Sequence, residues 1–580
     1  MRLGNLGVPQ VFCHGNVQIS RVLCIAQRLR SLYRSDPDRI ACTFLAAGRV
    51  ESITFGELYR RSLAYARRLG EEGVKPGDVV LVILQHTPHL AYSYLGAILA
   101  GAIPSFMPFP SPKQRPELYW ADHQALFARI EPRLIVTYAR NLADARAGIS
   151  DFSVPTLVAG DEIFSIPGDP EIEYAGFAAS PDDVACLQHS SGTTSLKKGV
   201  MLTHRAIFDE VSAYSRAIDF GPSDSIASWL PLYHDMGFIA CFMASMLEGT
   251  HLVQLDAFEW TIRPHLLLDA MQDYRTTFCW LPNFAFSHIA NTVPAQRRWD
   301  LSAVRAIIDC SEPCKKETFD RFAARFGECG IGPETLQVSY AMAENVFAVT
   351  QTTIGRPVRV AALDGAAFAS GRAEPARPGG PQIAVVSCGP PLDGVEIRVR
   401  DERSTILPDG SIGEIAVASP FLFTGYYKLP QKTSERLRDG WYATGDMGFL
   451  LEGELFVTGR IDDMLIVNGR NYYAHEIEAI VNTVPSLLPG RNVAIGVDDP
   501  RSDATSVVVL AECVAGCDAG MAGREVKRAI LERLGLAIGS LVPLAAGELI
   551  KTTSGKISRT KNKELFLERA LRSAGASDGS

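Results

Sequence analysis

The chain has 580 residues, more than the roughly 100–200 residues that one hydrophobic core usually organises, so several structural units are expected. Hydrophobic residues make up 47% and charged residues 21%, ordinary values for a soluble globular protein. A formal net charge of −8 argues against a general electrostatic grip on nucleic acid, so no nucleic-acid partner is expected.

The twelve cysteines are scattered singly along the chain, without a Cys-x-x-Cys pair. Cys310 and Cys314 are spaced like metal ligands but lack a partner set, which favours buried or loop thiols. Reduced cysteines and a polar, arginine-containing start without a signal sequence predict a cytoplasmic protein.

The first elements read as alternating helices and strands. Thr54 to Glu57 form a capping-box pattern that opens a helix. The β-branched run Val79–Leu84 predicts a strand, followed by a helix from about Pro88 to Gly101 and another strand. No charged residue occurs from Val79 to Pro112, but five prolines interrupt the ~20 consecutive apolar residues that a membrane helix needs. No membrane span is therefore expected.

The same alternation recurs further along the chain. Helices are predicted over Thr203–Phe220 and Leu266–Tyr274, and strands over Ser225–Trp229 and Thr276–Leu281. Alternating helices and strands favour parallel strands that are covered by helices.

After Thr350 the pattern changes. The stretch to Pro381 is rich in Ala, Gly, Pro and Arg, with a strand-like piece at Pro357–Leu363. From Val385, short strands and turns predict a β-rich subdomain. From His475, helices and strands alternate over about a hundred residues, enough for a small domain. The predicted fold class is α/β: a large N-terminal part with two α/β subdomains and a β-rich subdomain, then a small mobile α+β C-terminal domain.

The stretch "LQHSSGTTSLKKGVMLTH" places Ser, Gly and Thr ahead of Lys197 and Lys198. Backbone N–H groups in such a turn form an anion-binding concavity, and Lys198 can neutralise outer phosphates. It is not a Walker loop, because no Gly-Lys-Ser/Thr follows at the required distance. A polar surface turn is the alternative.

Two further stretches have both a chemical and a structural interpretation. "SWLPLYHDMGF" carries His234 and Asp235, a catalytic pair or a structural hydrogen bond, without a nucleophile elbow nearby. "VSYAMAEN" carries Tyr340 and Glu344 just after a strand. An aromatic ring can stack on a purine and a carboxylate can hold Mg²⁺, whereas routine packing of a helix start is the alternative.

The C-terminal third has four isolated charges in Gly-rich surroundings. Asp446 is predicted on a Gly-flanked turn, where it can accept both hydroxyls of a ribose, and Arg460 on another turn with Asp462 two residues later. Lys556 is predicted on a Ser-Gly turn near the C-terminus. Taken singly, each is a solvated charge.

Together, and in this order, these motifs resemble those of the adenylate-forming superfamily, which includes acyl-CoA and aryl-CoA ligases, luciferases, adenylation domains and fatty acyl-AMP ligases. The resemblance runs from about Ile53 to Lys563. The matching elements are the phosphate loop His189–Val200, the Tyr-Gly-x-x-Glu element Tyr340–Glu344, the Thr-Gly-Asp at Thr444–Asp446, the hinge Gly459–Asp463 and the lysine element Lys551–Lys556.

Within the superfamily, the sequence motifs are most similar to those of the fatty acyl-AMP ligases. "SWLPLYHDMG", "CSEP" (Cys310–Pro313) and "VTGRIDDMLIVNGRNYY" are close to that subgroup. An insertion at about 351–386 also matches, and in such ligases it is thought to restrain the C-terminal domain and discourage CoA use. The resemblance implies an N-terminal AMP-binding domain over 1–460 and a mobile C-terminal domain with the catalytic lysine over 461–580.

The implied reaction joins a carboxylic acid, fatty or otherwise large and apolar, to AMP from ATP with Mg²⁺. The acyl group then passes to a phosphopantetheine thiol, on an acyl carrier protein in lipid or polyketide-type biosynthesis. One alternative is a ligase that forms the CoA thioester itself. An alternative of another class is a non-catalytic adenylate-binding homologue.

The resemblance also implies residue roles. Lys556, Glu344 and His234 match catalytic positions, with Lys556 bridging carboxylate and α-phosphate and His234 beside the carboxylate. Ser190 and Glu344 match the Mg²⁺ positions, and Asp462 the hinge. The remaining ATP contacts are implied at Ser191, Gly192, Thr193, Thr194 and Lys198 for phosphates, Ser311, Glu312, Pro313 and Tyr340 for adenine, and Asp446 and Arg460 for ribose.

Some positions depart from the family pattern without removing a catalytic charge. They are Ser195 for glycine, Lys197 for proline, Cys310 and Ser311 for Gly-Ala, Ala341 for glycine and Ala474 for proline. The acid is poorly specified, and a fatty, aryl or polycyclic acid fits. The aromatic and sulfur side chains that either line an apolar tunnel or belong to the core are Trp229, Phe238, Phe242, Met243, Trp280, Phe284 and Phe286.

Overall fold

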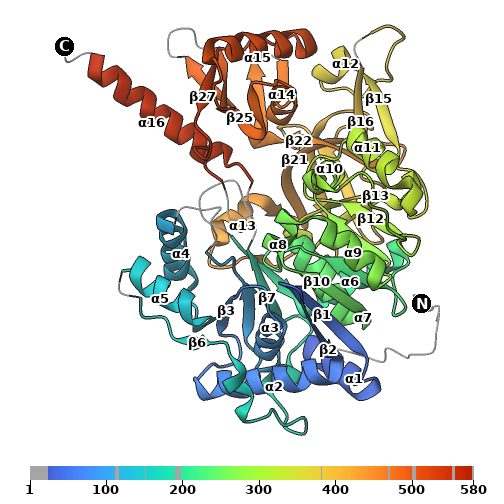
Figure 1. The fold of residues 1–580 in the computed structure, drawn as a ribbon, viewed down its shortest axis with the longest axis vertical. Coiled ribbons are helices and arrows are strands. Elements are labelled where there is room, and N and C mark those ends of the chain that lie inside the picture. Colours follow the sequence, from blue (N-terminus) through green and yellow to red (C-terminus); the bar gives the residue numbers. More distant parts are fainter. Residues whose placement is uncertain are drawn as a thin grey trace, which may run out of the picture.

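The computed structural model describes residues 24–110, 116–150, 152–189, 198–380, 382–467, 470–499, 504–551 and 556–577. Figure 1 shows a large body formed by the N-terminal three quarters and a smaller part above it that contains α14 (Ala474–Val481) and α15 (Ala519–Leu534). The helix α16 (Arg559–Ser577) leaves this smaller part and extends past α4 (Pro116–Ile130).

Two largely parallel sheets form the first half of the body. The smaller sheet has the order β4-β3-β5-β6, with strands Ile103–Phe106, Val79–Ile83, Leu134–Thr137 and Thr156–Val158. The larger has the order β14-β13-β12-β11-β9-β10-β1-β2, with strands Ala348–Gln351, Leu336–Ala341, Ala306–Asp309, Phe278–Leu281, Ser225–Ser228, His251–Leu255, Ile40–Ala46 and Arg49–Thr54. The predicted α/β alternation is confirmed.

The helices predicted between these strands are present. In α2 (Phe55–Glu71) the Thr54 hydroxyl accepts the backbone N–H of Glu57 at 3.1 Å, as the capping pattern requires. The uncharged segment forms β3, α3 (His89–Leu99) and β4, and α6 (His204–Ile218) and α9 (His265–Asp273) cover the larger sheet. Within the described part of the chain, no helix is both long and apolar enough to cross a membrane.

A third, antiparallel sheet follows the insertion. Its order is β17-β18-β21-β20, and β22 (Glu454–Arg460) pairs with β21. The other four strands span Glu396–Arg400, Gly413–Ala418, Trp441–Leu451 and Leu437–Arg438. This matches the predicted β-rich subdomain.

The predicted insertion at 351–386 contains a hairpin of β15 (Val360–Asp364) and β16 (Gln382–Val386), with α12 (Gly365–Ala369) between them. Phe368 of α12 packs in one buried cluster with Phe449 and Phe456 of the third sheet and with Tyr473. The insertion therefore contacts both the β-rich subdomain and the segment that leads into α14.

The smaller part has a core of its own. Side chains between Leu465 and Ile538 form a buried cluster in which α14 and α15 pack on β25 (Leu487–Asp499) and β26 (Ala504–Cys513), while β27 (Ser540–Leu544) pairs with β26. A separate core is what a mobile C-terminal unit needs, and the division at residues 460 and 461 remains a prediction.

Candidate active site

Asp446 and Arg460 lie directly opposite each other on the paired strands β21 and β22. Arg460 Nε is 3.1 Å from Asp446 Oδ1, and the Tyr340 hydroxyl donates to Asp446 Oδ2 at 2.5 Å. The prediction that both charges stand on turns is wrong, because strand pairing positions them. Burial raises the pKa of the Asp446 carboxyl, and Arg460 and Tyr340 oppose that rise by stabilising its charged form.

Glu344 lies close to this pair on a short 3₁₀ helix, η6 (Ala343–Asn345). The prediction placed Tyr340 and Glu344 after a strand, whereas Tyr340 is still part of β13 and only Glu344 lies beyond it. The Tyr426 hydroxyl donates to Glu344 Oε1 at 2.6 Å and is 3.2 Å from the Tyr442 hydroxyl. We call Tyr340, Glu344, Tyr426, Asp446 and Arg460 the carboxylate corner.

Lys198 joins the carboxylate corner from the end of the predicted phosphate loop. Its ammonium lies 4.8 Å from the centre of the Tyr426 ring, within range of a cation–π contact. Burial lowers the pKa of Lys198, and the positive charges of Lys432, Arg436 and Arg460 lower it further, while Glu344 opposes them. The surroundings of Lys198 are thus rich in positive charge, which favours binding of a polyanion.

Most of the predicted phosphate loop lies outside the described residues. This applies to residues 190–197, and so to Ser190, Ser191, Gly192, Thr193 and Thr194, as well as to the departures Ser195 and Lys197. The flanking strands are described: β7 (Val184–His189) leads into the loop and β8 (Gly199–Thr203) leaves it, paired antiparallel.

Lys556 reaches the body of the protein from the C-terminal part. Its ammonium donates to the backbone carbonyl of Ser311 at 3.0 Å. Ser311 has φ +72, in the left-handed region that few non-glycine residues adopt, and it directly follows the buried Cys310. Glu312 accepts the backbone N–H of Phe284 at 3.1 Å, and Pro313 is exposed. The C-terminal lysine and the predicted purine loop are therefore brought together.

His234 and Asp235 lie at the start of a π-helix, η3 (Met236–Met243). The chain turns sharply here, since a Cβ on Gly237 would lie 2.5 Å from the carbonyl oxygen of Pro231. Burial raises the pKa of Asp235, the charge of Lys556 lowers it and that of Glu344 raises it. Asp235 therefore lies near Lys556 and Glu344, and His234 directly precedes it in the chain.

The sequence and fold can now be compared with known proteins. The model of the AMP-binding enzyme family matches residues 30–427. The chain belongs to the AMP-binding enzyme family. This range includes Lys198, the purine loop and the carboxylate corner up to Tyr426, and the chain is accordingly a ligase that forms acyl-adenylates from ATP.

Characterised AMP-binding enzymes match over almost the full chain. The long-chain-fatty-acid–AMP ligase FadD28 of Mycobacterium bovis is 29% identical over 92% of this chain and 96% of its own length. The medium-chain-fatty-acid–[acyl-carrier-protein] ligase JamA of Moorena producens is 29% identical over 93% and 94%. A solved structure from work on the fatty acyl-adenylate ligases of E. coli and L. pneumophila is 25% identical, with a TM-score of 0.86 over 95% of this chain and 98% of that one.

In this AMP-binding enzyme the C-terminal part is held against the body by a second contact. Lys561 at the start of α16 forms an ion pair with Asp122 of α4 at 3.2 Å.

The predicted hinge residue, Asp462, is exposed on a 3₁₀ turn (Ile461–Asp463) and lies two residues beyond the carboxylate corner. Ala474 is buried at the first position of α14, where a proline would also be accommodated.

Sequence reasoning missed Tyr426, which contacts both Glu344 and Lys198. It stands on β19 (Gly425–Tyr426), directly across from Val200 of β8. Its hydroxyl reaches Glu344 across 82 positions of sequence, so no local pattern reveals the contact. The nearest available signal was the tyrosine pair in "TGYYKLP", which shows a buried aromatic without showing its partner.

Proposed function

We propose that this AMP-binding enzyme activates a fatty or other large apolar carboxylic acid and hands the acyl group to a phosphopantetheine thiol on an acyl carrier protein. The observation that carries the proposal is the contact between Lys556 and the Ser311 carbonyl. It sets the predicted catalytic lysine beside the purine loop, with Asp235 and Glu344 close enough for their charges to interact. One cation and the residues that we assign to the nucleotide thus share one space.

In the first half-reaction a carboxylate oxygen attacks the α-phosphorus, the bond to the β-phosphate breaks, and pyrophosphate leaves. Negative charge accumulates on the α-phosphate and the leaving group, so cations placed in advance stabilise the transition state. We assign Lys556 to the α-phosphate and the carboxylate, and Lys198 to the outer phosphates. We place His234 beside the attacking carboxylate.

The nucleoside is assigned to the other side of the same space. Asp446 would accept the ribose hydroxyls, and its present bond from Tyr340 and ion pair with Arg460 hold its carboxylate in place for them. Tyr340 would stack on adenine, with Ser311, Glu312 and Pro313 along the purine edge. The phosphate-loop residues Ser191, Gly192, Thr193 and Thr194 keep their sequence-based assignment.

The residues fit a bound Mg²⁺, which prefers one or two carboxylates together with substrate phosphates. Glu344 offers such a carboxylate, and it is positioned by Tyr426. Ser190 would be the second protein ligand. Among the described residues no cluster of three or more His, Cys, Asp or Glu side chains could hold a metal ion, in keeping with a metal that arrives with ATP. When bound, the ion neutralises phosphate charge.

In the second half-reaction a thiol attacks the acyl carbonyl and AMP leaves. Support for a carrier-protein acceptor comes from JamA, whose name describes it as an acyl-carrier-protein ligase. The insertion adds support, because α12 packs against Tyr473 beside α14 and so can restrain the C-terminal part. We place the enzyme in the cytoplasm, in lipid or polyketide-type biosynthesis.

A ligase that forms the CoA thioester itself is the second candidate. The observation in its favour is a relative from Mycobacterium tuberculosis, provisionally named a fatty-acid–CoA ligase, which is 29% identical over 93% of this chain. Presenting purified enzyme with CoA and with holo acyl carrier protein separates the two, since each thioester product is identified directly by mass.

The test of the proposal is ATP–pyrophosphate exchange over a panel of linear, aryl and polycyclic carboxylic acids, with the acyl-adenylate detected directly. We expect exchange that depends on both the acid and Mg²⁺. An enzyme that binds ATP but shows no pyrophosphate exchange in the presence of any acid of the panel would contradict the proposal. That result would favour a non-catalytic adenylate-binding protein.

A further inference from the structure

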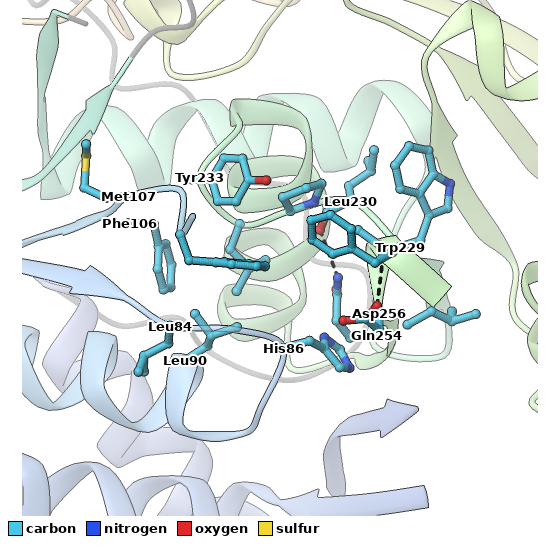
Figure 2. Close-up of a pocket in the computed structure, with 16 residues that line it drawn as sticks. Leu84, His86, Leu90, Phe106, Met107, Trp229, Leu230, Tyr233, Gln254 and Asp256 are labelled. Carbon is cyan, nitrogen blue, oxygen red and sulfur yellow. Dashed lines mark hydrogen bonds between the residues drawn. The ribbon is translucent and has the colours of Figure 1, made fainter. Parts of the chain in front are cut away.

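A mostly apolar pocket opens where the carboxyl ends of β3 and β4 face those of β9 and β10. It contains about 500 Å³ of empty space, part of which is open to solvent. Figure 2 shows Leu84, Leu90, Phe106 and Met107 gathered toward one end, whereas His86, Gln254 and Asp256 gather toward the other. We call this the chain pocket.

The polar end of the chain pocket has hydrogen-bonding atoms without partners among the described residues. They are Gln254 Oε1 and His86 Nε2. Gln254 is 97% buried, given an exposed fraction of 3%. A buried polar atom without a partner costs about 1–3 kcal/mol, so two in one pocket indicate a ligand that supplies the partners.

Gln254 and Trp229 are each fixed in orientation by a second contact. The Gln254 amide N–H donates to the carbonyl of Leu230 at 2.9 Å, which leaves the amide oxygen as the free acceptor. The Trp229 indole stacks on Trp260 with ring centres 3.7 Å apart and planes 4° apart. The pocket therefore presents Gln254 Oε1 as a rigid acceptor, whereas the Trp229 indole extends away from the Gln254 amide (Figure 2).

Residues that line the chain pocket are followed directly in sequence by residues that lie near Lys556. Leu230, Pro231, Leu232 and Tyr233 line it, and His234 and Asp235 follow directly. On its other side the Trp229 ring is 6.1 Å from the ring of Phe284, whose N–H binds Glu312 of the predicted purine loop. An acid whose carboxylate lies at His234 thus has this pocket as an apolar path for its chain.

We infer that the chain pocket binds the hydrocarbon chain of the acid and selects a chain that carries a hydroxyl group at the height of Gln254. This rests on the proposed function. A hydroxyl donates its proton to the amide oxygen of Gln254 and so satisfies it. A keto oxygen has no proton to donate to that oxygen, and a second carboxylate is repelled by Asp256.

The test compares saturated fatty acids of different lengths with their monohydroxylated counterparts, moving the hydroxyl along the chain, in ATP–pyrophosphate exchange. Sites built to bind a hydroxyl strongly reject the analogue that lacks it. We expect at least one hydroxy acid to exceed its parent acid about tenfold or more in kcat/KM. Parent acids that equal or exceed every hydroxy acid would overturn the inference.

One variant ties the preference to the named atom. Gln254→Met removes the acceptor at similar volume and should reduce the preference for the hydroxy acid about tenfold. Gln272→Met is the matched control, because its amide oxygen accepts the N–H of Asp300 outside the pocket, and it should leave the preference unchanged.

The outcomes separate the inference from the function on which it rests. Activation of parent acids with no loss of preference in Gln254→Met contradicts the inference and leaves the proposed function standing. It would mean that the Gln254 amide oxygen binds water. A lack of pyrophosphate exchange with every acid of both kinds contradicts the proposed function.

Discussion

The carboxylate corner and the chain pocket satisfy their polar atoms in opposite ways. In the corner, Asp446 and Glu344 each have a tyrosine hydroxyl within 2.6 Å, and Asp446 also has Arg460. In the pocket, Gln254 and Trp229 are locked in position but leave one atom each without a partner. Under the proposed mechanism, the residues used in every turnover are held in place by the protein itself, whereas Gln254, which would select the acid, is left for the acid to complete.

The largest expected effect comes from removing the cation that reaches the purine loop from the C-terminal part. Lys556→Ala should lower adenylation at least about 100-fold, because this ammonium would stabilise the negative charge that accumulates on the α-phosphate. Pyrophosphate release and circular dichroism measure activity and folding separately. Lys563→Ala, on α16 shortly after Lys556, is the control. Near-normal adenylation by Lys556→Ala would remove its catalytic assignment.

A smaller loss of activity is expected when Glu344 of the carboxylate corner loses a hydrogen-bond donor. Tyr426→Phe keeps the ring under Lys198 but removes the hydroxyl that holds Glu344, so that side chain gains rotational freedom. We expect about a tenfold rise in the Mg²⁺ concentration needed for half-maximal rate, the value of one hydrogen bond to a charged group. The folded state should be little changed.

The adjacent Tyr427→Phe serves as control for this variant, because the backbone N–H of Tyr427 and not its hydroxyl binds Gly199. If Tyr426→Phe lowers the rate without shifting the Mg²⁺ dependence, Tyr426 supports packing and does not position Glu344.

A change outside both regions should alter the thiol acceptor alone. Phe368→Ala loosens the insertion from Phe449, Phe456 and Tyr473, so the C-terminal part is less restrained. We expect CoA thioester to increase about threefold relative to acyl carrier protein thioester, with pyrophosphate exchange unchanged. Ile406→Ala, an exposed side chain, is the control. An unchanged acceptor ratio would remove the insertion from acceptor choice.

The smallest effect on activity is expected at Glu210, a buried carboxyl behind the corner. One oxygen accepts the N–H of Ala348 at 2.9 Å and the other has no partner among the described residues. Burial raises the pKa of Glu210 from 4.5 to about 8. The folded state therefore keeps a proton that the unfolded chain loses, and its stability falls between these two pH values, by up to about 1.4 kcal/mol per pH unit.

Glu210→Gln removes this titration while keeping the acceptor for Ala348. The difference in unfolding free energy between variant and wild type should therefore grow in favour of the variant from pH 5 to pH 8, as measured by urea unfolding. Equal pH profiles for the two proteins would show that Glu210 is ionised in the folded state.

Much of this arrangement could be predicted from the sequence, and the errors have a common physical cause. Capping and β-branched runs gave α2 and β3 because those signals are local. Asp446 was misplaced on a turn because Gly445 and Gly448 flank it. In the structure β21 continues through both glycines, with Gly445 at φ +75 and a register shift before Gly448. Glycine marks a β-bulge as readily as a turn.

The contact partners of the site residues could not be predicted from local sequence patterns. Tyr426 meets Glu344 through the pairing of β19 with β8, and Gln254 meets Leu230 at the ends of neighbouring strands. Of the seven side chains considered for the tunnel, Trp229 lines the chain pocket, whereas Trp280 and Phe286 are buried in the core. The periodicity and spacing of hydrophobic residues in the sequence identify which side chains are buried. Only the packing of the sheets decides which of these side chains faces a cavity.

The contact between α16 and α4 is one of several that hold the two parts of the molecule together. The ion pair of Lys561 with Asp122 is partly exposed, with side-chain exposed fractions of 26% and 39%, and such pairs contribute about 0–1 kcal/mol. The bond from Lys556 to the Ser311 carbonyl is also made by an exposed side chain. Two contacts this weak break on thermal energy. In the proposed reaction, the binding of ATP and the release of pyrophosphate therefore decide how long Lys556 stays at the purine loop.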